Sequence, residues 1–233
     1  MCEKSDLIAW AKRSGTNIHY GDLMTICSIK HWESVDKRRA KGRIVFRGDN
    51  VRDQNNAAAV FQELSASPTS IHDTNGSIAY GCIPGHKVTT SDAVKAYIQS
   101  LLKSKSQTWV SIPKELWPDE WHKLGYVKPM CRLDRALYGH PESGGHWEKH
   151  LTSAITARGG KPVINNPSLF WFPKSKLLLT VYVDDLMLSG PAEKHDAFWQ
   201  DLRTGDQPIV LEDYEPLGRF LGREHVPIHL DKS

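Results

Sequence analysis

The sequence contains few cysteines, and no two of them have the spacing of a metal-binding or redox pair. The four cysteines lie at positions 2, 27, 82 and 131. A zinc ribbon or a thioredoxin-like centre needs a Cys-x-x-Cys pair, so neither class is supported. The eleven histidines are scattered. Cys82 with His86, or His146 with His150, offers two ligands without a second pair. This cysteine usage is typical of a reducing, intracellular compartment.

The sequence also has no long hydrophobic run and no marked excess of one charge. No stretch approaches the roughly 18 consecutive apolar residues that a membrane span requires. The opening residues, MCEKSDLIAWAKRSG, are too polar for a signal peptide. We therefore expect a soluble, intracellular protein, cytoplasmic or nuclear, that is not secreted and has no membrane partner. The formal net charge of +3 does not by itself indicate a nucleic-acid partner, because the distribution of charge matters more than its sum.

What the sequence does contain is enough apolar material for a substantial core. Of 233 residues, 39% are hydrophobic and 24% are charged, which fits one large domain or two closely packed subdomains. Positive charge is locally concentrated, because seven consecutive positions contain Lys37, Arg38, Arg39, Lys41 and Arg43. Such a run is as consistent with a solvated surface as with a binding surface.

Hydrophobic periodicity predicts a mixture of helices and short strands. Apolar runs predict strands at 22–30, 43–46 and 108–113, and a hairpin at 177–190. Propensity or spacing predicts helices at 55–65, 88–102, 146–160 and 191–203. The Ser-, Thr- and Gly-rich stretch 66–87 predicts a loop with one short strand at 77–83. This mixture, without internal repeats, predicts an α+β fold.

Two adjacent acids interrupt the apolar hairpin. The run LLLTVYV (177–183) is followed by Asp184 and Asp185, and LMLSG (186–190) resumes it. Carboxylates about 4–6 Å apart repel each other, and a dry setting increases the penalty. A divalent cation such as Mg²⁺ offsets the repulsion, because hard cations prefer carboxylate oxygen. A solvated Asp-Asp turn is the commoner explanation of such a pair taken alone.

A third acid, Asp92, precedes an apolar stripe with helical spacing. Taken alone, Ser91 and Asp92 are typical of an ordinary helix N-cap. Taken with Asp184 and Asp185, Asp92 completes a set of three carboxylates at two junctions of secondary structure, and these could meet across a sheet. Two metal ions about 3.5–4 Å apart would then activate a hydroxyl group and stabilise a leaving oxygen on phosphorus.

Several segments resemble the reverse transcriptase domain of copia-type retrotransposon Pol polyproteins. Tyr182-Val183-Asp184-Asp185 resembles the YxDD box of reverse transcriptases. LDRALYGHPESGGHW (133–147) resembles the copia-type signature "ALYGLKQSPRxW", and DAVKAYI (92–98) resembles "DVKTAFL". KGRIVFRG (41–48) resembles "KARLVARG", and LGRFLG (217–222) resembles the end segment "LGxxxxxLG". YxDD alone is a weak indication, but the blocks occur in the family's order over roughly residues 22–226.

The resemblance implies a two-metal nucleotidyl transfer from a dNTP to a primer 3′-hydroxyl. Asp92 and Asp184 would ligate both Mg²⁺ ions, Asp185 would be a secondary ligand, and Mn²⁺ would substitute for Mg²⁺. Tyr97 occupies the place of the aromatic residue that selects deoxy substrates, although its place on the apolar stripe equally fits core packing. The remaining residues that would contact the dNTP or the template are Lys41, Arg43, Arg47, Tyr138, Gly139 and Tyr182.

The resemblance also implies a right-hand polymerase with fingers and a palm built on an antiparallel sheet. The expected divisions are an N-terminal extension (1–21), a fingers and palm domain (22–226) and a truncated tail (227–233). A thumb would be short or missing, and the integrase and RNase H domains of a full polyprotein would be absent. The expected partners are an RNA or DNA template with its primer, and dNTPs.

Two departures from the family pattern keep other functions open. HPESGGH (140–146) replaces "LKQSPR" and so removes two basic residues, and Glu142 adds an acid there. A catalytically inactive, truncated retrotransposon remnant that keeps only the fold and weak nucleic-acid binding is therefore the alternative. An unrelated α+β interaction domain would require all of these ordered matches to be accidental.

Overall fold

The computed structural model describes residues 1–30, 32–61 and 69–228. It divides into two compact units. The first unit comprises Met1–Leu64 and Ser100–His146, and the second comprises Ser65–Gln99 and Trp147–Ser233. Within the three described ranges, every helix is too short or too polar to cross a membrane.

The first unit is built on one six-stranded sheet. Its strands, in spatial order, are β1 (Cys2–Glu3), β7 (Pro129–Arg132), β6 (Gln107–Ser111), β2 (Ile18–Lys30) and β3 (Arg39–Phe46), with β4 (Arg52–Asp53) also paired to β2. Strands β2 and β6 run parallel, whereas β2 and β3 form a long antiparallel hairpin. The helices are α1 (Lys4–Ser14), α4 (Asp119–Lys123) and two short 3-10 helices, Val35–Lys37 and Lys114–Leu116.

Helix α1 packs one apolar stripe against this sheet. Leu7 and Ala11, four residues apart, are buried with Ile18 of β2 and Met130 of β7. The helix ends where Gly15 adopts a left-handed backbone (φ 67°) and its N–H bonds the carbonyl of Ala11. Residues 1–21 thus contribute β1, α1 and the start of β2 to the sheet of the first unit.

The second unit is built on a second six-stranded sheet. Its strands, in spatial order, are β12 (Glu215–Pro216), β5 (His86–Asp92), β11 (Asp185–Pro191), β10 (Leu177–Tyr182), β9 (Asn166–Phe172) and β8 (Lys161–Val163). Every pair is antiparallel. Two further strands, β13 (Arg219–Phe220) and β14 (Arg223–Glu224), form a separate short ribbon.

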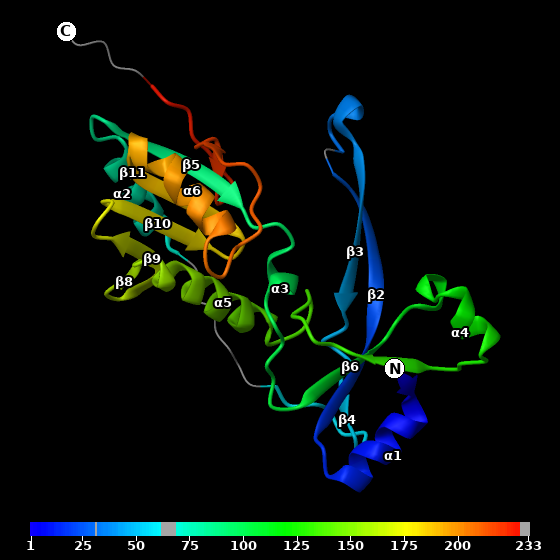
Figure 1. Cartoon of the computed structure of the whole chain (residues 1–233). Helices are drawn as coiled ribbons and strands as arrows, with labels where there is room; N and C mark the ends of the chain where they lie inside the picture. Colours follow the sequence, from blue (N-terminus) through cyan, green and yellow to red (C-terminus); the bar gives the residue numbers. More distant parts are fainter. Residues whose placement is uncertain (31, 62–68, 229–233) are drawn as a thin grey trace. The chain divides into compact units, whose positions relative to one another are not determined.

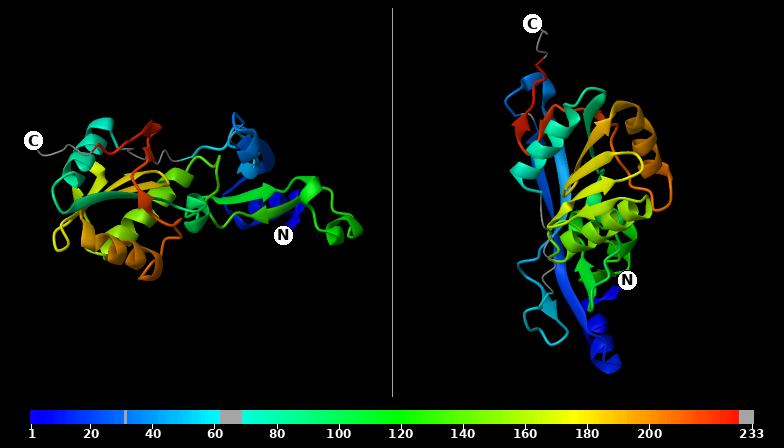
Figure 2. Two further views of the ribbon diagram at one scale, coloured as in Figure 1. Left: turned by 90° about the horizontal axis from the view of Figure 1, so that it is seen from above. Right: turned by 90° about the vertical axis from the view of Figure 1, so that its left-hand side faces the viewer.

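Helices cover both faces of this sheet, as the left view of Figure 2 shows. On one face, α5 (Ser143–Ala157) and α6 (His195–Thr204) bury leucines of β10 and β11 in the largest core cluster. On the other face lies α2 (Ile71–Gly81), where the hydroxyls of Ser77 and Thr180 are 2.7 Å apart in a buried hydrogen bond. Because both faces are covered, the central strands are buried on both sides. The short helices α3 (Ala96–Gln99) and Ala192–Lys194 complete the unit.

The helix predicted at 88–102 is wrong. Residues up to Asp92 belong to β5, and only Ala96–Gln99 are helical. Asp92 is therefore the last residue of a strand and not a helix N-cap. The apolar residues at helical spacing serve separate segments, because Leu101 forms a β-bridge with Arg135. The run Val88-Thr89-Thr90 favours a strand through its β-branched side chains.

The loop and strand predicted within 66–87 are also wrong, since Ile71–Gly81 form α2. Ser70 and Asp73 make a capping box at the start of this helix. At one of the small residues that suggested a loop, close packing against the sheet leaves no room for a side chain. A Cβ atom on Gly81 would fall 2.1 Å from Cγ2 of Val88.

The helix predicted at 55–65 is absent from its described part, which consists of turns and a bridge up to residue 61. One carboxylate oxygen of Asp53 accepts hydrogen bonds from the backbone of Asn55 (2.8 Å) and Ala57 (2.9 Å), and such Asx-type bonding competes with helix formation. Residues 62–65 of that prediction, and 229–233 of the predicted tail, lie outside the described residues. Helix α5 begins at Ser143, earlier than predicted, and α6 begins at His195, after Pro191 ends β11.

Candidate functional site

The predicted acidic hairpin is confirmed, and it places Asp185 opposite Asp92 at one end of the central strands of the second sheet, with Asp184 in the adjoining loop. Strands β10 and β11 are joined by the two-residue loop Val183–Asp184, with Tyr182 directly opposite Asp185. Strand β11 also pairs with β5, and there Asp185 is directly opposite Asp92. Figure 1 shows β5, β11 and β10 side by side in the second unit. Cross-strand partners have Cβ atoms about 4.5–5.5 Å apart, so the carboxylates of Asp92 and Asp185 are neighbours.

Burial fixes this register. Leu186 and Leu188 of β11 and Leu179 of β10 are fully buried in the core beneath α5 and α6. A slip of one residue would turn these leucines to the opposite face, so the pairing that sets Asp185 against Asp92 is strongly specified. The hydrophobic pattern of the hairpin therefore determines the position of the acids.

The loop itself is held by two hydrogen bonds that its backbone carbonyls accept. The indole N–H of Trp147 donates to the carbonyl oxygen of Val183 at 2.7 Å. The backbone N–H of Ala93 donates to the carbonyl oxygen of Asp184 at 2.7 Å. Val183 has a left-handed backbone with φ 56°. Sequence reasoning did not single out Trp147, although the residue ends the block 133–147 that carries part of the family resemblance.

Burial and neighbouring negative charge both act on Asp185. The pKa of Asp185 is raised from 3.8 to about 6, first by burial, then by the charges of Asp92 and Asp184, and by a hydrogen bond with Asp92. Below that pKa, a proton on Asp185 relieves the repulsion between the two adjacent carboxylates. Burial, followed by the charge of Asp184, also raises the pKa of Tyr97, so this ring lies near the same carboxylate.

These residues fit a divalent cation by donor type and by charge. Carboxylate oxygens are the ligands that Mg²⁺ prefers, and Mg²⁺ is commonly held by one or two carboxylates together with substrate phosphates. The charges of Asp92 and Asp184 raise the pKa of Asp185, so a cation at this position would offset negative charge. Within the described ranges, no three His, Cys, Asp or Glu side chains converge on one point. Asp184 would therefore have to turn its carboxylate to join the other two.

The predicted basic residues lie in the first unit. In the β2–β3 register, Lys30 is opposite Arg39, Ser28 is opposite Lys41 and Ile26 is opposite Arg43. Since directly opposed residues share a face and residues two apart lie on the same side, these four cations form one face of the hairpin. We call Lys30, Arg39, Lys41 and Arg43 the basic face. Among the described residues, the side chains of Lys30, Arg39 and Arg43 form no ion pair.

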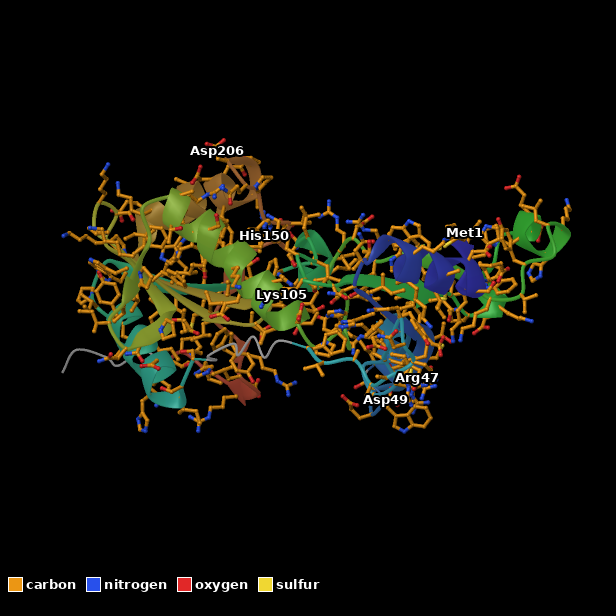
Figure 3. All side chains as sticks on the ribbon, turned by 90° about the horizontal axis from the view of Figure 1, so that it is seen from below. Met1, Arg47, Asp49, Lys105, His150 and Asp206 are labelled. Carbon is orange, nitrogen blue, oxygen red and sulfur yellow. The ribbon has the colours of Figure 1, made fainter. Side chains whose placement is uncertain are left out.

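Arg47, Tyr138 and Gly139 meet where β3 ends. The backbone N–H of Phe46 donates to the carbonyl of Tyr138 at 2.7 Å. Gly139 has φ +88°, and a Cβ atom there would lie 2.0 Å from the carbonyl oxygen of Phe46, so this position requires glycine. Arg47 forms an exposed ion pair with Asp49 at 3.2 Å, and Figure 3 labels both residues. The arginine is thus already partnered by an acid that sequence reasoning did not single out.

The predicted site residues therefore fall into two groups. Asp92, Asp184, Asp185, Tyr97 and Tyr182 gather in the second unit around the β10–β11 loop. The first unit contains the rest, namely Lys41, Arg43, Arg47, Tyr138 and Gly139.

Comparison with known proteins supports a common origin with mobile elements. The chain is 28% identical over 201 residues to a retrovirus-related Pol polyprotein from transposon RE1 of Arabidopsis thaliana, covering 84% of this chain and 13% of that protein. It is 27% identical over 191 residues to the corresponding polyprotein from transposon RE2, covering 80% and 12%. Its homologues are retrotransposon Pol polyproteins.

The similarity extends beyond plants but covers a small part of each relative. A truncated transposon Ty1-A Gag-Pol polyprotein of Saccharomyces cerevisiae is 28% identical over 92 residues, covering 40% of this chain and 8% of that protein. The chain spans roughly an eighth of the length of the two Arabidopsis relatives. No protein-family model matches it.

Proposed function

We propose that this Pol-related chain is the core of an RNA-directed DNA polymerase that extends a primer with deoxynucleotides. The observation that carries the proposal is the direct opposition of Asp92 and Asp185 across β5 and β11, with Asp184 in the adjoining loop. Acids this close, with one pKa raised to about 6, form a site for divalent cations, and the order of the sequence blocks resembles copia-type reverse transcriptases.

In this proposal the chain works mainly by positioning and by charge. Asp92 and Asp184 would hold two Mg²⁺ ions, or Mn²⁺, with Asp185 as a secondary ligand. When bound, the ions would lower the pKa of the primer 3′-hydroxyl and stabilise charge on the transferred phosphorus. Tyr97, next to Asp184, limits space at the sugar and so favours deoxy substrates. Tyr182 packs beside Asp185 and supports the primer end.

The first unit supplies the substrate-binding residues of the proposal. Lys41 and Arg43 on the basic face, with Arg47, bind the triphosphate and the template, because planar guanidinium groups donate paired hydrogen bonds to phosphate oxygens. Tyr138 and Gly139 shape the pocket for the base. The proposed fold is a right-hand polymerase, with the second sheet as palm and the β2–β3 hairpin as fingers.

A primer-extension assay on poly(rA)/oligo(dT) with Mg²⁺ tests the proposal. Asp184→Asn should lower the extension rate by about 100-fold or more, because it removes charge that is used at the reacting phosphorus. The control is Asp206→Asn, an exposed carboxylate of the same unit that Figure 3 labels, and it should extend primers at the wild-type rate. Circular dichroism should show both variants folded.

Two results would contradict the proposal. Undiminished extension by Asp184→Asn would remove the acids from the mechanism. A folded wild-type chain that extends no primer with either Mg²⁺ or Mn²⁺ would favour the inactive remnant instead.

A further inference from the structure

The loop that carries Asp184 has an unfavourable backbone. Val183 is β-branched and adopts φ 56° in a two-residue loop between paired strands. Left-handed φ values are rare for non-glycine residues, and a β-branched residue there is an outlier that persists only when its surroundings hold it. The residue next to it in sequence is the proposed metal ligand Asp184.

Two hydrogen bonds from separate segments of the chain hold this loop. The backbone N–H of Ala93, adjacent to Asp92, reaches the carbonyl of Asp184 at 2.7 Å. The indole N–H of Trp147 reaches the carbonyl of Val183 at 2.7 Å. The first bond belongs to the strand that carries Asp92. The second comes from α5, which lies outside the sheet.

Trp147 is anchored firmly enough to act as a clamp. Its side chain is 2% exposed and packs in the same core as Leu151 and Leu186. A buried indole N–H needs an acceptor, and any nearby oxygen would satisfy it. Here the acceptor is the carbonyl of the strained residue immediately before Asp184, so the bond fixes the direction in which the loop presents that carboxylate.

We infer that Trp147 is a positioning residue: its indole N–H holds Val183 in the left-handed conformation and so orients Asp184 for cation binding. The cation-binding part of this inference rests on the proposed function, whereas the loop-holding part does not. If the clamp exists to hold an unfavourable backbone, its importance must fall when the backbone is no longer unfavourable. Glycine adopts positive φ without strain, so Val183→Gly should make the clamp largely dispensable.

The matched control is a second buried tryptophan of the same core. Trp199 is 1% exposed, and its indole N–H donates to the hydroxyl of Thr89 at 2.9 Å, away from the loop. Trp147→Phe and Trp199→Phe each keep most of the ring and remove one buried hydrogen bond. A purely structural role predicts the same consequences for both variants.

The first measurement is hydrogen exchange of the Ala93 amide, which bonds the Asp184 carbonyl and reports loop opening without any metal. Trp147→Phe should speed this exchange about tenfold relative to Trp199→Phe at equal global stability, which urea unfolding would establish. In the Val183→Gly background the same substitution should change the rate by less than about threefold. Equal exchange in the two Trp→Phe variants, or an undiminished effect of Trp147→Phe in the Val183→Gly background, would overturn the inference.

The second measurement is Mn²⁺ binding to the free protein by electron paramagnetic resonance. Trp147→Phe should raise the Kd about tenfold, Trp199→Phe should leave it unchanged, and Asp184→Asn should abolish binding. Wild-type binding that Asp184→Asn abolishes but Trp147→Phe leaves intact would overturn the orienting role alone. A wild-type chain that binds no Mn²⁺ would contradict the proposed function, and Ala93 exchange would still decide whether Trp147 holds the loop.

Discussion

Each of the two large sheets places like charges opposite each other on neighbouring strands, but in contrasting surroundings. In the second unit, Asp185 of β11 is directly opposite Asp92 of β5, and the adjoining strand is buried. In the first unit, Lys30 of β2 is directly opposite Arg39 of β3, and both side chains are exposed. Directly opposed like charges destabilise a sheet, so each pair is a local cost that the fold has to offset.

The contrast teaches how each cost is met. Burial and the neighbouring acids favour the protonated form of Asp185 and raise its pKa to about 6. Exposure lets water and salt screen the cations. Each arrangement is also complementary to a different ligand, since a divalent cation can replace the shared proton and a polyanion can replace the screening ions. The segment from Leu23 to Phe46 contains six basic and two acidic residues, a net charge of +4, whereas the formal net charge of the whole chain is +3.

The largest expected difference between the hairpins is in their contribution to stability. Leu186→Ala in β11 should lower the free energy of unfolding by about 2–5 kcal/mol, because the side chain is fully buried and its loss leaves a cavity. Ile26→Ala in β2, where the side chain is 39% exposed, should cost less than about 1 kcal/mol. Urea unfolding followed by circular dichroism measures both. Similar losses would show that the β2–β3 hairpin is covered in solution.

The next difference is in the response to pH. A pKa raised in the folded state means that the stabilisation is complete below the unfolded value of 3.8 and is lost as pH rises through about 6. The free energy of unfolding of the wild type, minus that of Asp185→Asn, should therefore fall by on the order of 2–3 kcal/mol between pH 4 and pH 7. Burial also lowers the pKa values of His140 and His195 to about 4, so these histidines make the free energy of unfolding rise with pH in the same window. Subtracting the value of Asp185→Asn from that of the wild type removes this opposite contribution.

An acid of the first unit sharpens this comparison. Burial acts to raise the pKa of Asp22, but hydrogen bonds from Lys128 and Ser111 outweigh it and lower the pKa. Its stabilisation is present above its ordinary pKa of 3.8 and is lost only as pH falls below that value. Asp22→Asn should thus have its largest pH-dependent effect below pH 4.

One result would contradict the prediction for Asp185. If the wild-type minus Asp185→Asn difference in the free energy of unfolding does not vary between pH 4 and pH 7, Asp185 and Asp92 share no proton.

The same contrast explains what the sequence could predict. The β10–β11 hairpin and its acids were predictable, because two apolar runs flank one polar interruption and burial leaves no other register. The strand β5 was missed, because Val94, Tyr97, Ile98 and Leu101 have helical spacing although they serve separate segments.

Helix α2 and the Trp147 clamp show two further limits. Thr74, Ser77 and Gly81 look like loop residues, but they are small because the helix lies close to the sheet. Only the tertiary structure reveals that contact. The bond from Trp147 to Val183 could not be foreseen either, since nothing in the sequence specifies the acceptor of a buried indole.

The smallest expected effect tests whether the basic face binds a polyanion or is simply solvated. The variant R39Q/K41Q/R43Q should bind a single-stranded oligonucleotide about tenfold more weakly at 0.1 M salt. The slope of log K against log salt should fall by about 2, since each phosphate contact on a single strand contributes about 0.7. The control K12Q/K123Q/K161Q removes the same charge from exposed positions elsewhere and should change the affinity and the slope much less. Fluorescence anisotropy measures both.

Stability separates this result from damage to the hairpin. Arg39→Gln also removes the repulsion with Lys30, so it should raise the free energy of unfolding by about 0.2–1 kcal/mol while it weakens binding. Opposite changes in stability and affinity are expected only if the like-charge pair is kept for a ligand. Equal losses of affinity in the triple variant and its control would attribute binding to net charge alone. Wild-type affinity in the triple variant would identify the basic face as a solvated surface. In that case only the acidic hairpin would bind a ligand, and the repulsion on the basic face would be screened by water and salt alone.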